Sequence, residues 1–305
     1  MKKILITGGL GHIGSRICNF FLEKNYDVFC IDNFMTHRYI SLKGLINKNN
    51  FKFSEVDVVK DKDELESIIN KNNFDAIIHL AAITDAASSF DKKDKLLENN
   101  LNSTKNIVDI CLKKNLRLIY PSSTSVYGSS EKIVDEENND FLNPQSPYAE
   151  CKLLEEEIIL NSLKNNFYIL RLGTIFGVSN GMRFHTAVNK FCFQVVTGVP
   201  ITVWETAMDQ FRPYLDLEDA CRCSEFFIKN EKKFGIYNVN TLNLTVRELI
   251  NEIKNHTKLL EIKYVNSKIM NQLSYFVSNK KIINCGFVFN GSLKKSISDT
   301  FNWFN

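Results

Sequence analysis

Short apolar runs alternate with longer amphipathic segments along most of the chain. The runs have the length of β-strands and lie at residues 3–8, 27–32, 51–57, 76–81, 117–122, 167–173 and 236–241. They are apolar throughout, which is typical of parallel strands that are covered on both faces. The segments between them, such as 94–114 and 146–165, are long enough for crossover helices. The pattern predicts an α/β fold with a Rossmann-type, doubly wound parallel sheet of about seven strands.

This regularity ends after Gly173. Residues 174–215 carry turn residues and aromatic side chains before a helix-like pattern resumes. We expect residues 1–173, with 216–241 returning to them, to form the sheet domain. The remainder, 174–215 together with 242–305, should form mainly a smaller lobe that binds the substrate. No Pro/Gly/Ser-rich linker separates the two parts, so they should pack closely around a cleft at the carboxyl ends of the strands.

The composition narrows the classes of partner. The 305 residues include 38 basic and 35 acidic side chains, and the net charge of +3 is scattered along the chain. We therefore expect no nucleic-acid partner, because such a partner requires a basic patch. The eight cysteines form no CxxC pair, so neither a metal site nor a disulfide is expected. No apolar run could span a bilayer and the N-terminus is typical of a strand instead of a signal peptide, which predicts a cytoplasmic protein.

A glycine-rich turn, TGGLGHIGS, follows the first predicted strand and opens a helix. Its glycines allow a tight turn and a close approach of the backbone to a pyrophosphate, which the helix N-terminus attracts. Asp32 ends the second strand at the spacing expected of the acid that binds the adenosine ribose. Its charge would repel a 2′-phosphate, and Asn33 adds no positive charge. The sequence therefore predicts NAD as the cofactor in preference to NADP.

Two further strand ends should lie on the cofactor side. Asp57 ends the third strand, and an HLAA turn at 79–82 ends the fourth. We expect them to lie over the adenine and over the ribose or nicotinamide. His79 has no companion metal ligands, so a buried, hydrogen-bonded histidine is favoured over a metal ligand.

Tyr148 and Lys152 are spaced i and i+4 in SPYAECKLLEEE, on one face of a predicted helix. A phenol with its usual pKa of about 10 is a poor base at neutral pH, but a neighbouring ammonium and a cationic nicotinamide stabilise the phenolate. Hydroxyl side chains at 122–125 end the fifth strand, where they can hydrogen-bond the substrate oxygen that the tyrosine deprotonates. YxxxK alone is a common feature of helix surfaces, and it gains meaning from the motifs that precede it.

In this order, the motifs resemble the extended short-chain dehydrogenase/reductases, specifically the nucleotide-sugar epimerase/dehydratase family. The likeness runs through TGGLGHIGS, DN at 32–33, HLAA, ENNLNST, SSTSVYG, SPYAECK, LRLGTIFG, PITVW and RPYLDLEDA. It implies that Ser123 takes the serine/threonine role, Tyr148 is the base, and Lys152 activates the tyrosine and binds ribose. The implied cofactor-binding residues are Gly8, Gly11, His12, Ile13, Gly14, Asp32, Asn33, Asp57, Val58, Leu80, Ala81, Ala82, Asn100, Tyr148 and Lys152.

The resemblance also implies a nucleotide-diphosphate sugar as the substrate. The implied substrate contacts are Thr84, Ser123, Thr124, Tyr148, Thr174, Arg183, Asn189, Arg212, Lys268 and Tyr275. Arg212 resembles the family's arginine for the substrate pyrophosphate, whose oxygens suit a bidentate guanidinium. Lys268 stands roughly where many relatives have a second arginine, and Asn271 where many have aspartate. Because of these departures from the family pattern, the sequence does not assign the full set of residues that bind the substrate phosphates.

Arg183 and Asn189 lie in a segment that usually meets the nucleotide diphosphate, although a surface arginine and a helix-end asparagine fit equally well. Asn100 resembles an asparagine that supports the catalytic site. Relatives commonly dimerise through the helices that are expected here at 94–114 and 146–165. The resemblance therefore predicts a homodimer.

The reaction is inferred from Val126. The triplet in question is Thr124, Ser125 and Val126. Family 4,6-dehydratases resemble TDE or TSE here, and relatives that decarboxylate uronic acids commonly carry the same glutamate. This chain has valine in the place of that acid, and a valine cannot move a proton. Ser125 is poorly suited to the work of the cysteine that 3,5-epimerases place here. We therefore expect a nucleotide-sugar 4-epimerase that acts through a 4-keto intermediate. A C4 dehydrogenase or ketoreductase would use the same residues, and a non-catalytic NAD-binding protein needs only the cofactor turn. The nucleotide and the sugar are not specified.

Overall fold

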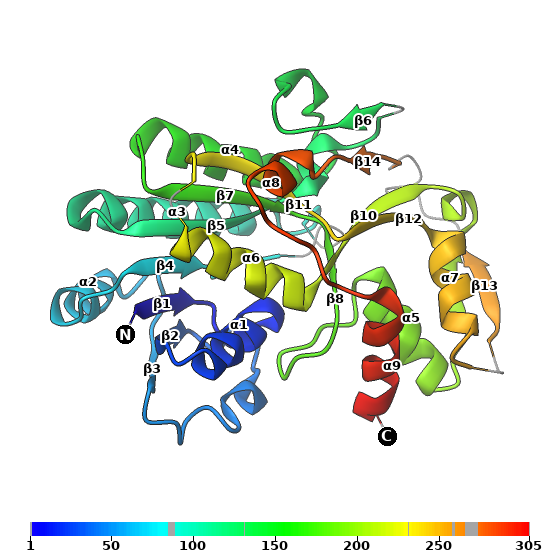
Figure 1. Cartoon of the computed structure of the whole chain (residues 1–305), viewed down its shortest axis with the longest axis horizontal. Helices are drawn as coiled ribbons and strands as arrows, with labels where there is room; N and C mark the ends of the chain where they lie inside the picture. The colour runs from blue at the N-terminus through cyan, green and yellow to red at the C-terminus, as the bar shows by residue number, and fades with distance from the viewer. Residues whose placement is uncertain are drawn as a thin grey trace.

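A seven-stranded parallel sheet forms the centre of the protein (Figure 1). The computed structural model describes residues 2–84, 89–130, 132–230, 232–257, 260–265 and 274–304. The strand order is β11-β7-β5-β4-β1-β2-β3, and every neighbouring pair is parallel. The strands are β1 (Lys3–Thr7), β2 (Asp27–Asp32), β3 (Phe51–Glu55), β4 (Ala76–His79), β5 (Arg117–Ser123), β7 (Phe167–Leu172) and β11 (Gly235–Val239). The predicted Rossmann-type sheet is confirmed.

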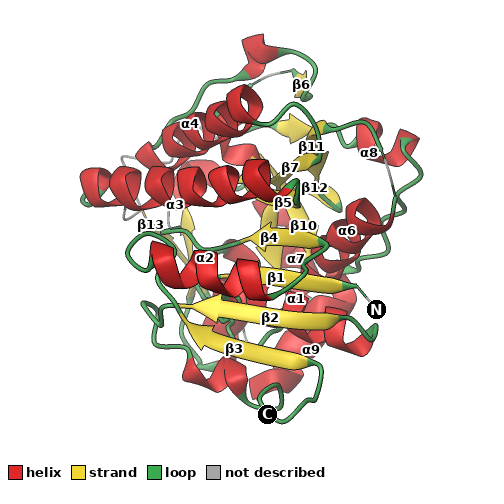
Figure 2. Ribbon diagram, turned by 90° about the vertical axis from the view of Figure 1, so that its left-hand side faces the viewer, coloured by secondary structure: helices red, strands yellow, loops and turns green. Residues whose placement is uncertain are grey.

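Helices lie on both faces of this sheet (Figure 2). They are α1 (His12–Glu23), α2 (Lys62–Lys71), α3 (Lys93–Lys114), α4 (Pro147–Ser162) and α6 (Leu217–Lys229). Helices α3 and α4 pack against each other. The Ser146 hydroxyl accepts a hydrogen bond from Ala149 N, and Pro147 occupies the first turn, so the sequence itself sets the start of α4. No helix in the described part of the chain is long and apolar enough to cross a membrane.

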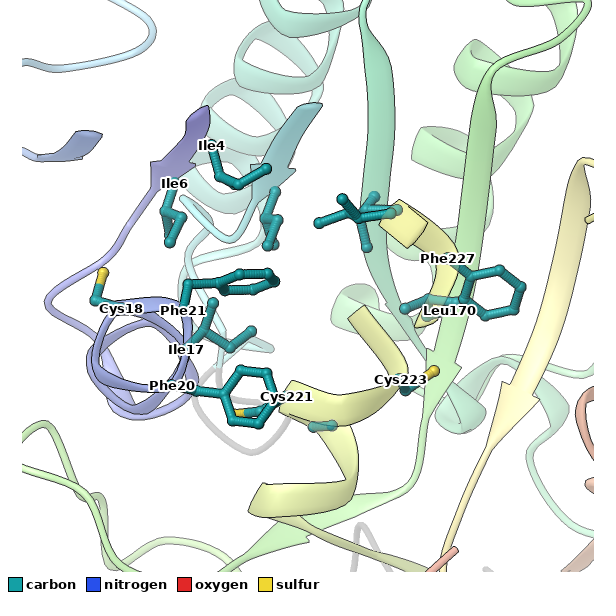
Figure 3. Close-up of a cluster of buried hydrophobic side chains, with 14 of the residues drawn as sticks. Ile4, Ile6, Ile17, Cys18, Phe20, Phe21, Leu170, Cys221, Cys223 and Phe227 are labelled. Atoms are coloured by element: carbon teal, nitrogen blue, oxygen red, sulfur yellow. The ribbon is translucent and has the colours of Figure 1, made fainter. Parts of the chain in front are cut away.

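The two helical layers explain why the central strands β1 and β4 are largely apolar on both faces. Ile4 and Ile6 of β1 face a layer to which α1 contributes Phe21 and α6 contributes Phe227 (Figure 3). Leu5, between them, faces the opposite layer, where α2, α3 and α4 supply buried side chains. Successive side chains of a strand point to opposite faces, so a strand between two layers needs apolar residues at every position.

A second group of elements follows Gly173 and lies beside the large sheet (Figure 1). Its members are β8 (Thr174–Phe176), α5 (Ala187–Val196), β9 (Ile201–Trp204), β10 (Phe211–Asp216), β12 (Leu242–Thr245), α7 (Val246–Lys254), β13 (Ile262–Val265) and α9 (Leu293–Phe304). Strands β12, β10 and β8 form one small sheet, and β13 pairs with β9. Phe176, Phe191 and Leu249 belong to a core of their own beneath these elements.

The chain returns to the large sheet near its C-terminal end. Short strands β6 (Ile133–Val134) and β14 (Phe276–Val277) pair with each other, and α8 (Lys280–Asn284) contacts β11. Ile282 and Phe287 join the core that α1 and α6 share. Four short 3-10 turns complete the described elements, at Tyr39–Leu42, Thr124–Tyr127, Asn139–Phe141 and Glu205–Ala207.

Candidate active site

A cavity of about 640 Å³ lies at the carboxyl ends of the central strands, and residues of the second lobe complete its wall. Most of the predicted site residues line it: Gly8, Gly11, His12, Ile13, Gly14, Asp32, Asn33, Asp57, Val58, Leu80, Ala81, Ala82, Thr84, Ser123, Thr124, Tyr148, Lys152, Thr174, Arg183, Arg212 and Tyr275. Asn100 and Asn189 are not in its wall. Lys268 and Asn271 lie outside the described residues.

The glycine turn leaves no space for side chains. Gly8 has a φ of +65°, and a Cβ there would lie 2.6 Å from Ala81 N. A Cβ on Gly14 would lie 2.4 Å from Gly8 O. Helix α1 begins at His12, and Gly11 before it provides no side-chain cap, so the first N–H groups of the helix are left for an anion. The turn therefore fits the pyrophosphate of a dinucleotide.

His12 adds a polar group to the same wall. Ser179 Oγ donates to His12 O at 2.8 Å and lies 2.9 Å from His12 Nδ1, so the network assigns the ring hydrogen to Nδ1. Nε2 is then a buried acceptor without a partner among the described residues. Burial, followed by the charges of Arg38, His185 and Arg183, lowers the pKa of His12 to about 3. A neutral imidazole with an unused acceptor fits a ligand that offers hydroxyl groups.

Two carboxylates lie on this half of the cavity. Asp32 accepts hydrogen bonds from Leu10 N at 3.0 Å and from Phe34 N at 2.9 Å, which ties it to the glycine turn. Burial raises the pKa of Asp32, and these N–H groups oppose the rise. Asp57 accepts a hydrogen bond from Asn33 Nδ2 at 3.0 Å. The first three strand ends therefore place their polar side chains together.

Sequence reasoning missed Arg38, which lines the cavity on the same half. Its Nη1 donates to Met182 O at 2.9 Å, in the loop that follows β8. The sequence argument looked for a positive charge only at position 33, which is the neutral Asn33, whereas the loop after β2 folds back and brings Arg38 to this region. Motif spacing contains no signal for that return.

Tyr148, Ser123 and Lys152 meet where β5 ends and α4 begins. The Tyr148 and Ser123 side chains are hydrogen-bonded, and Ser125 Oγ donates to Ser123 Oγ at 2.9 Å. Lys152 Nζ lies 5.9 Å from the centre of the Tyr148 ring. Burial raises the pKa of Tyr148, the Lys152 charge lowers it, and the Glu155 charge raises it again. Since burial outweighs the lysine, formation of the phenolate needs a further positive charge.

The role that the sequence argument gave to Val126 is wrong. Its side chain is fully buried among apolar residues of β6 and β14, and it does not line the cavity. The 3-10 turn after β5 directs Ser123, Thr124 and Ser125 to the cavity and turns Val126 away. The side chain at position 125 lines the cavity, and it is a serine. The absence of a catalytic acid at this turn therefore follows from Ser125 and not from Val126.

Arginines and hydroxyls line the other half of the cavity. Arg212 Nη2 donates to Gln210 Oε1 at 3.0 Å and Nη1 donates to Phe211 O at 3.3 Å, so both partners are neutral. Burial lowers the pKa of Arg212. A half-buried guanidinium between neutral acceptors favours an anionic ligand.

Arg183 and Tyr275 are held by threonines. Arg183 donates to Thr84 Oγ1 at 2.5 Å and to Thr84 O at 3.0 Å. The buried Tyr275 hydroxyl is hydrogen-bonded to the Thr124 side chain. These contacts bring residues from four separate parts of the chain to one wall.

Asn100 and Asn189 act on the backbone beneath that wall. Asn100 Oδ1 accepts from Ile83 N at 2.8 Å and Nδ2 donates to Ile83 O at 3.0 Å. Asn189 Oδ1 accepts from Gly177 N at 3.2 Å and Nδ2 donates to Gly177 O at 3.3 Å. Both side chains are fully buried and hold loops that carry cavity residues.

His79 is a buried histidine with two hydroxyl partners. Thr7 Oγ1 lies 2.7 Å from Nδ1 and Ser103 Oγ lies 3.3 Å from Nε2. Burial lowers its pKa to about 3. Across the described ranges, no three His, Cys, Asp or Glu side chains gather in a way that could hold a metal ion.

Residues of α5 and β9 complete the second half of the cavity, and sequence reasoning assigned none of them to the site. Lys190, Thr202 and Trp204 are among them. Each lies in an ordinary amphipathic segment, so its position in the wall follows only from how the second lobe packs.

Comparison with known proteins identifies the family. The pattern of the “NAD dependent epimerase/dehydratase family” matches residues 4–240. The chain belongs to this family. An ADP-L-glycero-D-manno-heptose-6-epimerase of Brachyspira hyodysenteriae is 30% identical over 278 residues, which cover 86% of this chain and 83% of that protein. A dTDP-D-glucose 4,6-dehydratase of Dictyostelium discoideum is 26% identical and covers 100% of this chain and 82% of its own length.

The fold of this epimerase/dehydratase family member agrees with a solved structure. UDP-glucuronic acid 4-epimerase from Bacillus cereus, solved with UDP-glucuronic acid and NAD, superposes with a TM-score of 0.85 over 99% of this chain and 98% of that one, at 24% identity. The relatives carry several activities on one architecture, so the reaction of this chain has to be argued from its own cavity.

Proposed function

We propose that the protein is an NAD-dependent nucleotide-sugar epimerase that inverts the configuration at C4. The supporting observation is the distribution of acids in the cavity. Among the described lining residues, the carboxylates are Asp32 and Asp57, at the glycine-turn half. The other half presents Ser123, Ser125 and Tyr148, which suit oxidation and reduction at one carbon, whereas removal of water calls for a further acid.

The cofactor half would hold NAD through the glycine turn, with Asp32 on the adenosine ribose and Lys152 on the second ribose. Residues 1–173 with 216–241 would thus carry the cofactor, and 174–215 with 242–305 mainly the substrate. Bound NAD supplies a hydride acceptor that later returns the hydride. The unused acceptor of His12 and the start of α1, which has no side-chain cap, agree with a dinucleotide here.

The residues at the end of β5 would handle the proton. Ser123 holds the C4 oxygen, and Tyr148 takes the hydroxyl proton as the C4–H hydride leaves, which produces a 4-keto sugar. Lys152 stabilises the phenolate that would otherwise be costly in a buried site. Inversion would require the 4-keto sugar to turn in the cavity so that its opposite face is reduced, and Tyr148 would then give the proton back to the same oxygen.

The second half would hold the nucleotide diphosphate. Arg212 offers a half-buried guanidinium to the pyrophosphate, and Arg183, beside Thr84, lines the same half of the cavity. Thr124, Thr174 and Tyr275 provide hydroxyl groups for the sugar. Lys268 stays a sequence-based candidate for a second phosphate contact, and Asn189 would act by holding the Gly177 loop.

A C4 dehydrogenase or ketoreductase must exchange its cofactor at every turnover, whereas an epimerase keeps it. The loop after β8 crosses the glycine turn: Gly181 N donates to Ser15 Oγ at 3.0 Å, and a Cβ on Gly181 would lie 2.4 Å from Gly11 O. Such a crossing favours retention of the cofactor and so favours the epimerase. The assembled Ser123, Tyr148 and Lys152 argue against a purely NAD-binding protein.

We further propose a homodimer through α3 and α4. These neighbouring helices expose Leu112, Leu154 and Leu160. Sedimentation would measure the mass, and Leu154→Glu should return a dimer to the monomer.

The test of the reaction is product analysis. Purified protein, with only the NAD it retains, is incubated with UDP-, GDP-, dTDP- and CDP-sugars, and products are separated by chromatography with mass detection. A new peak of unchanged mass supports epimerisation. A mass loss of two hydrogens that appears only with added NAD would replace it with a dehydrogenase, and a loss of water would overturn the argument from Ser125.

A further inference from the structure

A carboxylate lies directly behind the Tyr148–Lys152 pair. Glu155 follows Lys152 by one turn of α4, and its Oε2 lies 3.2 Å from Lys152 Nζ, with both side chains almost fully buried. Thr104 Oγ1, from α3, donates to Glu155 Oε1 at 2.9 Å. The tyrosine–lysine spacing in the sequence gives no reason for an acid at this position.

The Lys152 ammonium has three oxygen neighbours in the protein. Nζ donates to Tyr120 OH at 2.9 Å and to Pro121 O at 3.3 Å, and the third neighbour is Glu155. An ammonium has three hydrogens, so these three oxygens can occupy all of them. The Tyr120 hydroxyl is also hydrogen-bonded to Glu155, which closes a ring of three buried polar groups.

The charge of Glu155 opposes what Lys152 does for Tyr148. Burial by itself lowers the pKa of Lys152, but Glu155 and Tyr120 more than compensate, and the ammonium holds its proton firmly. The same carboxylate adds to the effect of burial and raises the pKa of Tyr148. Lys152 is therefore kept charged and in place, while its field at Tyr148 is reduced.

We propose that Glu155 is a positioning residue that anchors Lys152 and sets the pH at which Tyr148 accepts the substrate proton. The proposal rests on the proposed role of Tyr148 as the base. The titratable and charged groups that face this pair are Tyr148 and Cys151 of α4, Tyr120 of β5 and His79 of β4, with the neutral hydroxyls Ser103 and Thr104 on α3. His79 is neutral at working pH because its pKa is about 3, so Glu155 is the negative charge that faces the ammonium.

Glu155→Gln removes the charge and keeps the size and hydrogen-bonding capacity of the side chain. The Lys152 field then acts on Tyr148 without opposition, so the Tyr148 pKa falls and the acidic limb of the kcat/KM profile moves to lower pH. Lys152, with its counter-ion gone, also loses its proton at lower pH, and the alkaline limb should follow. An acidic limb that stays in place, or moves up, would overturn the proposal.

Three variants separate charge from structure. Glu64→Gln makes the same change on the exposed surface of α2, outside the proposed dimer helices, and should leave both limbs unchanged. Thr104→Val removes the hydroxyl partner but keeps the Glu155 charge, so the acidic limb should stay while kcat falls. Glu155→Asp keeps the charge with a shorter reach and should restore the wild-type profile with reduced kcat, which also covers the case in which the glutamine variant does not fold.

A second measurement needs no sugar. The absorbance of tyrosinate is titrated in the NAD-loaded protein and in its Tyr148→Phe variant, and the difference reports Tyr148 alone. The same difference in a Glu155→Gln background should show a lower pKa. A shifted titration without turnover of any sugar would keep this proposal and reject the epimerase, whereas epimerase activity with an unshifted titration would reject the role of Glu155.

Discussion

The two halves of the cavity are built in different ways. The half that we assign to the cofactor depends on backbone geometry, because the glycine turn leaves no space for a Cβ at Gly8 or Gly14 and Asp32 accepts from a backbone N–H of that turn. The half that we assign to the substrate depends on side chains from β5, α4, α5, β9 and β10. A relative that keeps this one turn keeps the first half of the cavity, whereas the second half can differ between relatives by single side-chain substitutions. This difference explains how relatives of one fold carry the names of 6-epimerase, 4,6-dehydratase and 4-epimerase.

The comparison predicts that activity and cofactor binding can be separated. Tyr148→Phe should lower turnover of a nucleotide sugar by roughly 10³-fold, because the ring still packs but the group that takes the proton is gone. NAD retained by the purified protein, measured after denaturation, should equal that of the wild type. Turnover near the wild-type rate would remove Tyr148 from the reaction.

The cofactor half should fail through its backbone. Gly8→Ala places a Cβ against Ala81 N in a residue with positive φ, so we expect NAD affinity to fall about 100-fold, or about 2.7 kcal/mol. Gly44→Ala is the matched control, since Gly44 also has positive φ but has nothing within 4 Å of the added Cβ. Calorimetric titration with NAD measures both. Equal losses in the two variants would point to strain in place of a crowded cofactor turn.

The substrate half should fail through a single charge. Arg212→Gln should raise KM for the nucleotide sugar by roughly 30-fold, or about 2 kcal/mol, and leave NAD affinity unchanged, because a charged hydrogen bond to phosphate is lost. Arg247→Gln serves as the control, because Arg247 is exposed and pairs with Asp209. If KM does not respond, the phosphate is held elsewhere in the second half.

Two buried histidines beside the cavity should make stability depend on pH. Burial depresses the pKa of His12 and of His79 to about 3, so the unfolded chain takes up protons first as pH falls below about 6.5. The contribution of these histidines to the free energy of unfolding is fully present above that pH. It is lost as the pH falls toward 3, by about 1.4 kcal/mol per histidine for each pH unit. Urea unfolding between about pH 7 and pH 5 should show this slope. His79→Gln should remove one histidine's share of it, and an unaltered slope would mean that His79 is not buried in its neutral form.

The sequence predicted the local features well. The apolar runs anticipated all seven strands of the large sheet, because helices on both faces favour apolar residues on both faces of most of its strands. The glycine turn and Asp32 were found because the residues that shape them are contiguous or follow one strand later. Most of the predicted site residues do line one cavity.

The misses have a common cause. Val126 was taken as the decisive position, but the 3-10 turn after β5 buries it and presents Ser125. Arg38 returns to the cavity only because its loop folds back, and Asn100 and Asn189 proved to hold backbone instead of lining the wall. Which way a side chain faces in an irregular turn is set by packing that a linear pattern does not encode.

The sequence by itself determined the sheet, the cofactor turn and the family, since these depend on periodicity and on short motifs whose residues act through backbone geometry. Only the tertiary structure decided which hydroxyls face the cavity, that Arg38 and Trp204 join its wall, and that Glu155 lies behind Lys152. These contacts join residues that are distant in the chain or that face a direction fixed by neighbouring elements. Their free energies arise from burial and charge, which exist only after the elements have packed.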